Sequence, residues 1–356
     1  MSEPHTHHVH DPSDPSDAPR RPVSMVDVAR RAGVSQKTVS RVVNGEPHVR
    51  EELRDRIHEA IRELGYRPNA AARSLVTRRT RRIGVVAFGA ALYGPSSVIA
   101  AIESVARADG YALSILRTET LDRHEVQGAV DALLDQGVEG IVLSEPLYLG
   151  GAALQVPEDV AVLTIGSQGL SDREDELVVG ADEFSAALLA TGHLLALGHA
   201  SVHHIAGPDA WVSSRLRRDG WRSALEGEGL EVPEVARGDW SPRSGFTAMQ
   251  TLLREAAPTA VFVANDQMAI GAIAAIEQAG MRVPQDVSIV GFDDLDVAEY
   301  LSTPLTTMRQ EFGVFARLGM ARLIRTIDGT PPAEVRQLVP ASLVTRATTG
   351  RPPHAP

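Results

Sequence analysis

The sequence predicts an α/β protein in which a small helical head precedes a large body built on parallel sheets. A tight glycine turn separates two short amphipathic segments around GVSQKTVSRVVNG, Gly33 to Gly45. Charge is divided unevenly: residues 20–82 hold 16 Lys+Arg against 7 Asp+Glu, a net +9, so the remaining residues carry −20 to give the −11 of the whole chain. From Ile83 onward, apolar runs alternate with amphipathic helical segments, which is typical of parallel sheets covered by helices.

The composition limits the possible classes of protein. A chain of 356 residues exceeds one typical hydrophobic core, so more than one domain is expected. The absence of cysteine excludes disulfides, thiol nucleophiles and thiolate metal sites. No apolar run reaches the length of a membrane span, and the opening MSEPHTHHVHDPSDPSDAPR lacks the apolar core of a signal peptide. We therefore predict a disordered tail over residues 1–21 and a cytoplasmic, nucleoid-associated location.

Residues 22–67 predict a head of three helices. Gly33 supplies the turn after the first helix, and Ser35 is placed to cap the second. The third helix begins after Arg50. The apolar side chains expected to face inward are Val26, Val28, Ala29, Ala32, Val39, Val42, Val43, Leu53, Ile57, Ile61 and Leu64.

The second helix leaves its polar side chains facing outward. Helix-turn-helix proteins use such a short helix to reach base edges in the major groove of DNA. An ordinary αα-hairpin is the alternative, and the basic charge of the head favours DNA. The predicted DNA contacts of the head are Ser35, Gln36, Lys37, Thr38, Arg41, Asn44 and His48.

The stretch YRPNAAARSLVTRRTRR, residues 66–82, predicts a hinge helix and linker over residues 68–82. Pro68 ends the third helix, and Asn69 can cap a helix of about two turns, too short to be stable without a partner helix or DNA. Leu75 would be exposed on it, which suits a wedge inserted into a minor-groove base step. A plain basic linker is the alternative. The predicted DNA contacts of this segment are Asn69, Ala72 and Leu75.

The body contains seven apolar runs that predict buried strands: IGVVAF, YALSILR, GIVLS, VAVLTIG, VHHIAG, AVFVAN and VSIVGFD. Ligands of parallel sheets bind beyond the carboxyl ends of strands, where the pairs Gly166-Ser167, Asn265-Asp266 and Asp293-Asp294 lie. A sugar-binding site needs planar polar side chains that hydrogen-bond to the hydroxyls and an aromatic side chain that packs against the ring face. Residues of these types at strand ends and in loops are Asn265, Asp293, Arg217 and Trp240.

Signatures of common enzymes are missing: the sequence holds no GxxxxGK[ST], GxGxxG, GxSxG or HExxH. His203 and His204 fall inside a strand-like run, where neighbours point to opposite faces and cannot share one ligand. We predict a protein that is not an enzyme, with no catalytic residues, no metal site and no cofactor.

The order VDVARRAGVSQKTVSRVVNG, a third helix, then YRPNAAARSL resembles the lac repressor (LacI/GalR) family of bacterial transcription regulators. The likeness continues through SRLRRDGW, GDWSPRSGF, VANDQMAIGA, GFDDLDVAEY and PLTTMRQEF, over roughly residues 22–349. It implies the two-lobed fold of periplasmic sugar-binding proteins for residues 83–350. The N-lobe would comprise about 83–180 and 310–340, the C-lobe about 181–309 and 341–350, and residues 351–356 a tail.

The resemblance also implies an effector site between the lobes. It assigns Arg217, Trp240, Asn265 and Asp293 to effector contact. It adds Ser213, Gln310, Phe312 and, as the apolar wall of the N-lobe, Leu92, Pro95 and Val98. Each polar candidate has an ordinary structural alternative. Asp293 or Asp294 can cap the next segment, Trp240 can be packing, and Arg217 can pair with a surface carboxylate.

The sequence departs from lac-type members of the family in several places. Gly166 stands where they carry an acidic sugar ligand, and Phe88 where they carry a small hydroxyl residue. Gln36 and Lys37 replace the lac-type pair in the recognition helix, so the operator sequence is expected to differ. No heptad helix follows RATTGRPPHAP, which predicts a homodimer rather than a tetramer.

We therefore predict a dimeric repressor that binds near-palindromic operator DNA of a carbohydrate operon and is released by a sugar, a galactoside by the lac-type motifs. A regulator of the same family answering to a purine or phosphorylated corepressor is the alternative. A soluble sugar-binding protein for transport needs an export signal and no helix-turn-helix. A carbohydrate enzyme needs a convergent acid–base pair, whereas Asp293 and Asp294 are adjacent and expected to diverge.

Overall fold

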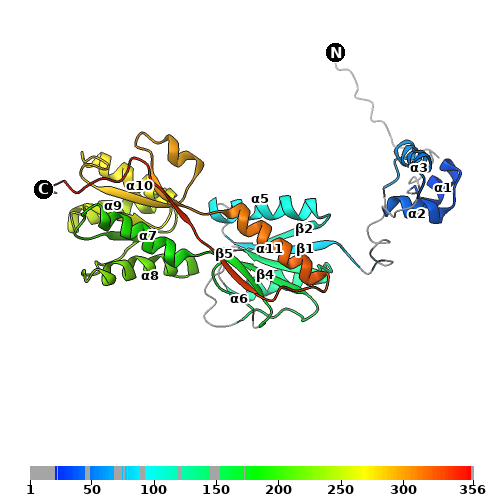
Figure 1. Ribbon diagram of the computed structural model, residues 1–356, viewed down its shortest axis with the longest axis horizontal. Helices are drawn as coiled ribbons and strands as arrows, with labels where there is room; N and C mark the ends of the chain where they lie inside the picture. The colour runs from blue at the N-terminus through cyan, green and yellow to red at the C-terminus, as the bar shows by residue number, and fades with distance from the viewer. Residues whose placement is uncertain are drawn as a thin grey trace, which may run out of the picture. The chain divides into compact units, whose positions relative to one another are not determined.

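The computed structural model describes residues 21, 23–44, 49–67, 74, 77, 79–88, 93–118, 122–144, 153–171 and 173–353. The chain divides into two compact units, residues 1–79 and 80–356. Figure 1 labels helices and strands of both units. Within the described ranges, no helix is both long and apolar enough to cross a membrane.

The head is built from α1 (Met25–Ala32), α2 (Gln36–Val43) and α3 (Glu51–Leu64). Ser24 and Asp27 form a capping box at the start of α1, and Gly33 ends that helix in the left-handed conformation with φ 65°. The Ser35 side chain caps α2 by accepting a hydrogen bond from the Thr38 amide. Local capping signals therefore define the tight turn that the sequence predicts.

A small apolar core joins the three helices and contains Val28, Ala29, Ala32, Val39, Val42, Ile57, Ala60 and Tyr66. The prediction that Val26 belongs to the buried side is wrong, because Val26 is 46% exposed. At about 100° per residue, Val26 lies on the opposite side of α1 from Val28.

The body contains two six-stranded sheets, and the first has the order β11-β5-β4-β3-β1-β2 with all neighbours parallel. Its strands are β1 (Arg82–Phe88), β2 (Ala112–Thr118), β3 (Gly140–Ser144), β4 (Ala161–Ile165), β5 (Leu177–Ala181) and β11 (Arg336–Val339). Helices α5 (Tyr93–Ala108) and α11 (Phe312–Ile327) pack together over one face, and α6 (Arg123–Asp135) covers the other. This sheet and its helices are the N-lobe.

The second sheet has the order β12-β10-β9-β8-β6-β7, parallel except for β12 against β10. Its strands are β6 (His203–Ala206), β7 (Ala236–Arg237), β8 (Ala260–Val263), β9 (Ser288–Asp293), β10 (Thr306–Arg309) and β12 (Ser342–Val344). Helices α7 (Glu183–Ala196) and α8 (Val212–Gly227) pack together on one face, as Figure 1 shows, and α9 (Pro242–Glu255) and α10 (Asp266–Gln278) on the other. A short 3₁₀ helix, η2 (Asp296–Tyr300), follows β9. This is the C-lobe.

The chain crosses between the lobes after β5, after β10 and after β11. Residues at the carboxyl ends of strands from both sheets meet in the cavities between the lobes. The predicted fold class, an α/β body of two parallel-sheet lobes behind a three-helix head, is confirmed. All seven predicted apolar runs form strands, and β5, β7, β10, β11 and β12 are additional to them.

Candidate ligand-binding site and DNA-binding surface

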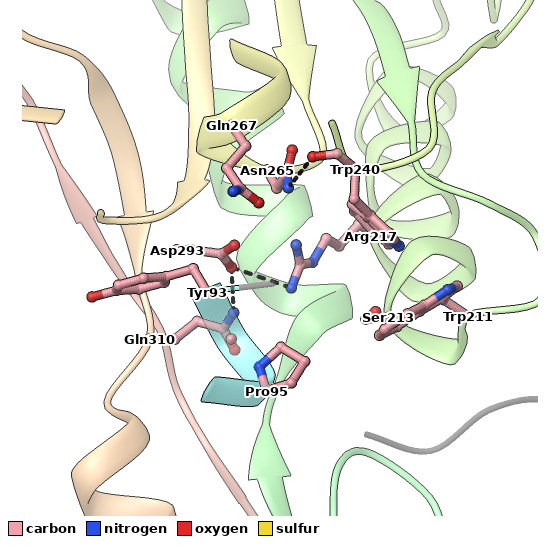
Figure 2. A pocket seen from close by; sticks show the side chains of 11 residues that line it. Tyr93, Pro95, Trp211, Ser213, Arg217, Trp240, Asn265, Gln267, Asp293 and Gln310 are labelled. Carbon is pink, nitrogen blue, oxygen red and sulfur yellow. Dashed lines mark hydrogen bonds and ion pairs between the residues drawn. The ribbon is translucent and has the colours of Figure 1, made fainter. Parts of the chain in front are cut away.

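A cavity lies between the lobes and is shown in Figure 2. The N-lobe contributes the start of α5, and the C-lobe contributes the starts of α8 and α10, the residue before the α9 cap and the end of β9. The lining residues that the sequence predicts are Pro95, Ser213, Arg217, Trp240, Asn265, Asp293 and Gln310. Tyr93, Gly94, Trp211 and Gln267 complete the lining. Residues from six separate elements or crossings thus converge on one site.

Arg217 is the buried cation of this cavity, with only 6% of its side chain exposed. Its Nε donates to Glu183 Oε2 at 2.6 Å, its Nη2 to Glu183 Oε1 at 3.3 Å, and its Nη1 to the Ala264 carbonyl at 2.5 Å. The guanidinium also stacks on the Phe292 ring, 3.7 Å from the ring centroid. Arg217 therefore does not pair with a surface carboxylate. Its bidentate partner is the buried carboxylate of Glu183.

Asp293 is the second charged group that lines the cavity, at the last position of β9. Its Oδ1 accepts a hydrogen bond from Gln310 Nε2 at 2.7 Å and lies 3.6 Å from Arg217 Nη2, as Figure 2 shows. Burial raises the pKa of Asp293 to about 6; Arg217 and Gln310 oppose this rise, and Glu183 adds to it. The carboxyl group of Asp293 thus changes its charge near pH 6.

Neither Asp293 nor Asp294 acts as a helix cap. The N-cap of η2 is Leu295, without a side-chain cap. Asp294 instead accepts hydrogen bonds from Arg309 Nε at 2.6 Å and from Arg346 Nη2 at 2.7 Å. Asp294 therefore ties the end of β9 to the last residue of β10 and to a residue just past β12, while Asp293 lines the cavity.

Trp240 and Asn265 form the upper wall of the cavity in Figure 2. Asn265 caps α10 by accepting from the Met268 amide at 2.9 Å, and its Nδ2 donates to the Trp240 carbonyl at 3.2 Å. Trp240 and Asp293 both adopt positive φ, 75° and 111°. Such conformations cost non-glycine residues about 1–3 kcal/mol and concentrate at functional sites.

Two buried polar atoms of this lining lack hydrogen-bond partners among the described residues: Trp240 Nε1 and Gln267 Oε1. A buried donor and a buried acceptor without partners cost free energy that a bound ligand can recover. Trp211 packs edge-on against Trp240 with ring centroids 5.7 Å apart, and against Phe88 of β1 at 5.4 Å. Phe88 of the N-lobe thus joins the two lobes through its aromatic contact with Trp211.

Two of the other predicted effector residues lie beside this cavity. Val98 and Phe312 line a second cavity, which shares Ser213 and Gln310 with the first. Leu92 lies outside the described residues. The sequence did not point to Tyr93, Trp211, Gln267 or Glu183. Gln267 was detectable, because it follows Asn265 by two residues in the first turn of α10.

The predicted DNA contacts of the head that are described lie on or beside α2. Gln36, Lys37 and Asn44 are exposed, and Arg41 is partly exposed. Ser35 and Thr38 are engaged with each other, with their hydroxyl oxygens 2.8 Å apart. The side chains of two predicted DNA contacts, Ser35 and Thr38, therefore already take part in capping α2. His48, Asn69, Ala72 and Leu75 lie outside the described residues.

The histidines of β6 are not a ligand pair. His204 is fully buried and stacked between Trp221 and Phe262, and burial lowers its pKa to about 3. Over the described ranges, no group of three or more His, Cys, Asp or Glu side chains is arranged to hold a metal ion.

A helix-turn-helix head attached to a two-lobed body with a polar and aromatic cavity defines a ligand-controlled DNA-binding regulator. Residues 24–69 match the family model described as bacterial regulatory proteins, lacI family, and residues 191–349 match a periplasmic binding protein-like domain. The chain is 38% identical to the lactose operon repressor of Escherichia coli K12 over 93% of its length and 92% of that protein. It therefore belongs to the lacI family of bacterial regulatory proteins.

Two further comparisons agree with this assignment. The ribose operon repressor of Escherichia coli K12 is 34% identical over 85% of this chain and 93% of that protein. A solved structure of the lac repressor dimer bound to operator and the anti-inducer ONPF matches with a TM-score of 0.83 and 36% identity, covering 93% of this chain and all of that one. The protein is a transcriptional repressor and not an enzyme.

Proposed function

We propose that the protein represses a carbohydrate-utilisation operon and that a neutral sugar bound between the lobes releases it from operator DNA. The observation that carries this proposal is the pairing of aromatic plates, Trp240 and Trp211, with the carboxylate of Asp293 in one cavity. Apolar ring faces and equatorial hydroxyls of a sugar match this combination of surfaces.

The charges of the site favour a neutral ligand over a phosphorylated one. Among the described residues, the charged side chains that line the two cavities are Arg217, Asp293 and Glu183. Arg217 is already paired with Glu183 and lies close to Asp293. A phosphate group would enter a site with two carboxylates and one occupied guanidinium, and like charges inside a protein repel strongly. The charges of the site therefore disfavour a phosphorylated corepressor, and a neutral purine is the alternative ligand.

The sugar we propose is a galactoside, on the strength of the lac-type motifs and the lactose operon repressor among the relatives. Control of DNA follows from linkage: a sugar that binds one arrangement of the lobes more tightly than the other shifts the protein toward that arrangement. If only the other arrangement presents the heads correctly, the sugar weakens operator binding.

Tryptophan fluorescence tests this proposal directly. Trp211 and Trp240 line the cavity, whereas Trp221 is fully buried elsewhere and donates to the Val202 carbonyl. A galactoside should change the emission of the wild-type protein and weaken its operator binding. Trp240→Phe should remove most of the signal, and Trp221→Phe serves as the matched control that retains it. If purines change emission and strengthen operator binding while sugars do neither, the corepressor function replaces this one.

Arg41 of α2 should provide sequence readout. Arg41→Ala should weaken binding to the operator by about 1–3 kcal/mol and binding to random DNA much less, because a bidentate contact to a guanine edge is lost only at the specific site. Fluorescence anisotropy with both DNAs at one salt concentration measures the difference. Equal losses on the two DNAs would make Arg41 a phosphate contact instead.

We further propose that the working form is a homodimer, since a two-fold dimer matches a near-palindromic operator. The lac repressor structure with TM-score 0.83 is itself a dimer. Sedimentation velocity at micromolar concentration should show a dimer and no tetramer. A stable tetramer in that experiment would refute this part of the proposal.

A further inference from the structure

Phe88 is the last residue of β1 in the N-lobe, but its ring packs against the apolar cluster of the C-lobe that includes Trp211 and Trp240. Its ring centroid lies 5.4 Å from that of Trp211, with the two ring planes at 60°. Among the described residues, Phe88 neither belongs to the two apolar clusters of the N-lobe nor packs against them. The packing of its own lobe therefore does not account for this side chain.

The C-lobe offers Phe88 a fixed surface. Trp211 is held at the start of α8, where its amide donates to the Pro208 carbonyl at 3.1 Å, and it is only 6% exposed. Trp211 packs edge-on against Trp240 with ring centroids 5.7 Å apart. The Trp240 ring lies on Gly207, where an added Cβ would come within 2.4 Å of it. Both tryptophans are thus anchored to the C-lobe by contacts that do not involve Phe88.

An aromatic contact between two lobes biases their arrangement. The lobes are joined by three crossings of the chain, and two-lobed proteins of this kind change shape by bending at such crossings. The ring of Phe88 reaches Trp211 only when the lobes lie together. An edge-to-face ring pair shifts a two-state equilibrium by about two- to tenfold, so this contact favours the joined arrangement over a separated one.

We infer that Phe88 is an interlobe latch: its ring, docked on Trp211, holds the lobes of the ligand-free protein in the arrangement that binds operator. The assignment of this arrangement to operator binding rests on the proposed function, in which the ligand-free protein is the repressing form. Trp211 also lines the cavity between the lobes, so a molecule bound there adjoins the ring that Phe88 holds. Occupancy of the cavity and the arrangement of the lobes are thereby linked through one side chain.

Single-molecule energy transfer on the full-length protein tests the latch without any ligand. The chain has no cysteine, so two introduced thiols can carry the donor and acceptor dyes. Ala132→Cys places one on the exposed surface of α6 in the N-lobe, and Arg222→Cys places the other on α8 in the C-lobe. An excess of unlabelled protein ensures that transfer occurs within one chain. Phe88→Ala should raise the population with separated lobes about two- to tenfold.

Operator binding provides the second measurement. Phe88→Ala should weaken the binding of the ligand-free protein to operator about two- to tenfold, as measured by fluorescence anisotropy at one salt concentration. Thermal unfolding checks that the variant is folded. If it is not, Phe88→Leu replaces it, since leucine also removes the ring.

Phe246→Ala is the matched control. Phe246 lies on α9 and packs against the same apolar cluster from within the C-lobe. Its removal loosens that cluster without changing a contact between Phe88 and Trp211. It should leave both the energy transfer and the operator affinity at their wild-type values.

Three outcomes would overturn the inference. If Phe88→Ala leaves the populations unchanged, the ring does not hold the lobes, although the proposed sugar function survives. If Phe246→Ala shifts the populations as much as Phe88→Ala does, the effect comes from packing inside the C-lobe. If the lobes separate and operator affinity does not fall, the latched arrangement is not the one that binds operator. Titration with sugars tests the proposed function separately in each case.

Discussion

Replacing Arg217 with methionine should lower the free energy of unfolding by about 3–5 kcal/mol, because it leaves the buried carboxylate of Glu183 without its counter-charge. The substitution also removes the donor to the Ala264 carbonyl and the stacking partner of Phe292. Asp293 contributes less to the loss, since Arg217 opposes the rise in its pKa and Asp293 can take up a proton when that guanidinium is gone. Urea denaturation at pH 7.5 measures the change.

The double variant Arg217→Met with Glu183→Met is the control. Because it removes both charges together, it should recover most of the lost stability, and the deviation from additivity gives the coupling energy of the pair. Neither Arg217→Met nor the double variant should bind the sugar. If the double variant is as unstable as the sum of the two single variants, the pair is not coupled and the stability argument is wrong.

The sequence predicts the central strands of both sheets. It misses most strands that lie at the sheet edges or directly before the chain crosses between the lobes. Six of the seven predicted strands are buried along almost their whole length, as expected of parallel sheets covered on both sides, whereas the edge strand β2 is mostly only partly buried. Strands β7 and β12 have two and three residues, and β11 mixes polar with apolar positions. Strand β5 is a fully buried five-residue run behind the acidic stretch DREDE, and its apolar pattern alone does not separate it from a loop.

Glu183 was missed as a site residue because strand β5 was not predicted. The search for polar residues after strands led to Asn265 and Asp293, because β8 and β9 were predicted. The same rule applied to β5 leads to Glu183, two residues past its end. The sequence also presents Arg217 as a donor for a ligand. That it pairs with Glu183, 34 positions away in the chain, follows only from the packing of α7 against α8.

Sugar affinity should fall by about tenfold when the pH is lowered from 7.5 to 5.0. Burial raises the pKa of Asp293 to about 6 in the unliganded protein. A sugar hydroxyl that donates to the carboxylate selects its ionised form, so each pH unit below 6 costs close to a tenfold loss of affinity. Calorimetric titration across this range measures the slope. Asp293→Asn should bind more weakly at pH 7.5 and show a flat profile, and a wild-type affinity that is constant or rises toward pH 5 would contradict this role.

Stability should respond to the same carboxyl group with the opposite sign. Because the pKa of Asp293 is raised above its ordinary 3.8, the folded protein binds the proton more tightly than the unfolded chain between about pH 4 and 6. This group therefore adds stability at low pH that is lost as the pH rises through 6. Burial lowers the pKa of His193, His199, His203 and His204, which acts in the opposite direction, and raises the pKa of Asp266, which acts in the same direction. The difference in unfolding free energy between wild type and Asp293→Asn cancels these histidines. That difference should favour the wild type more at pH 5 than at pH 7.5, while the difference in sugar affinity favours it more at pH 7.5.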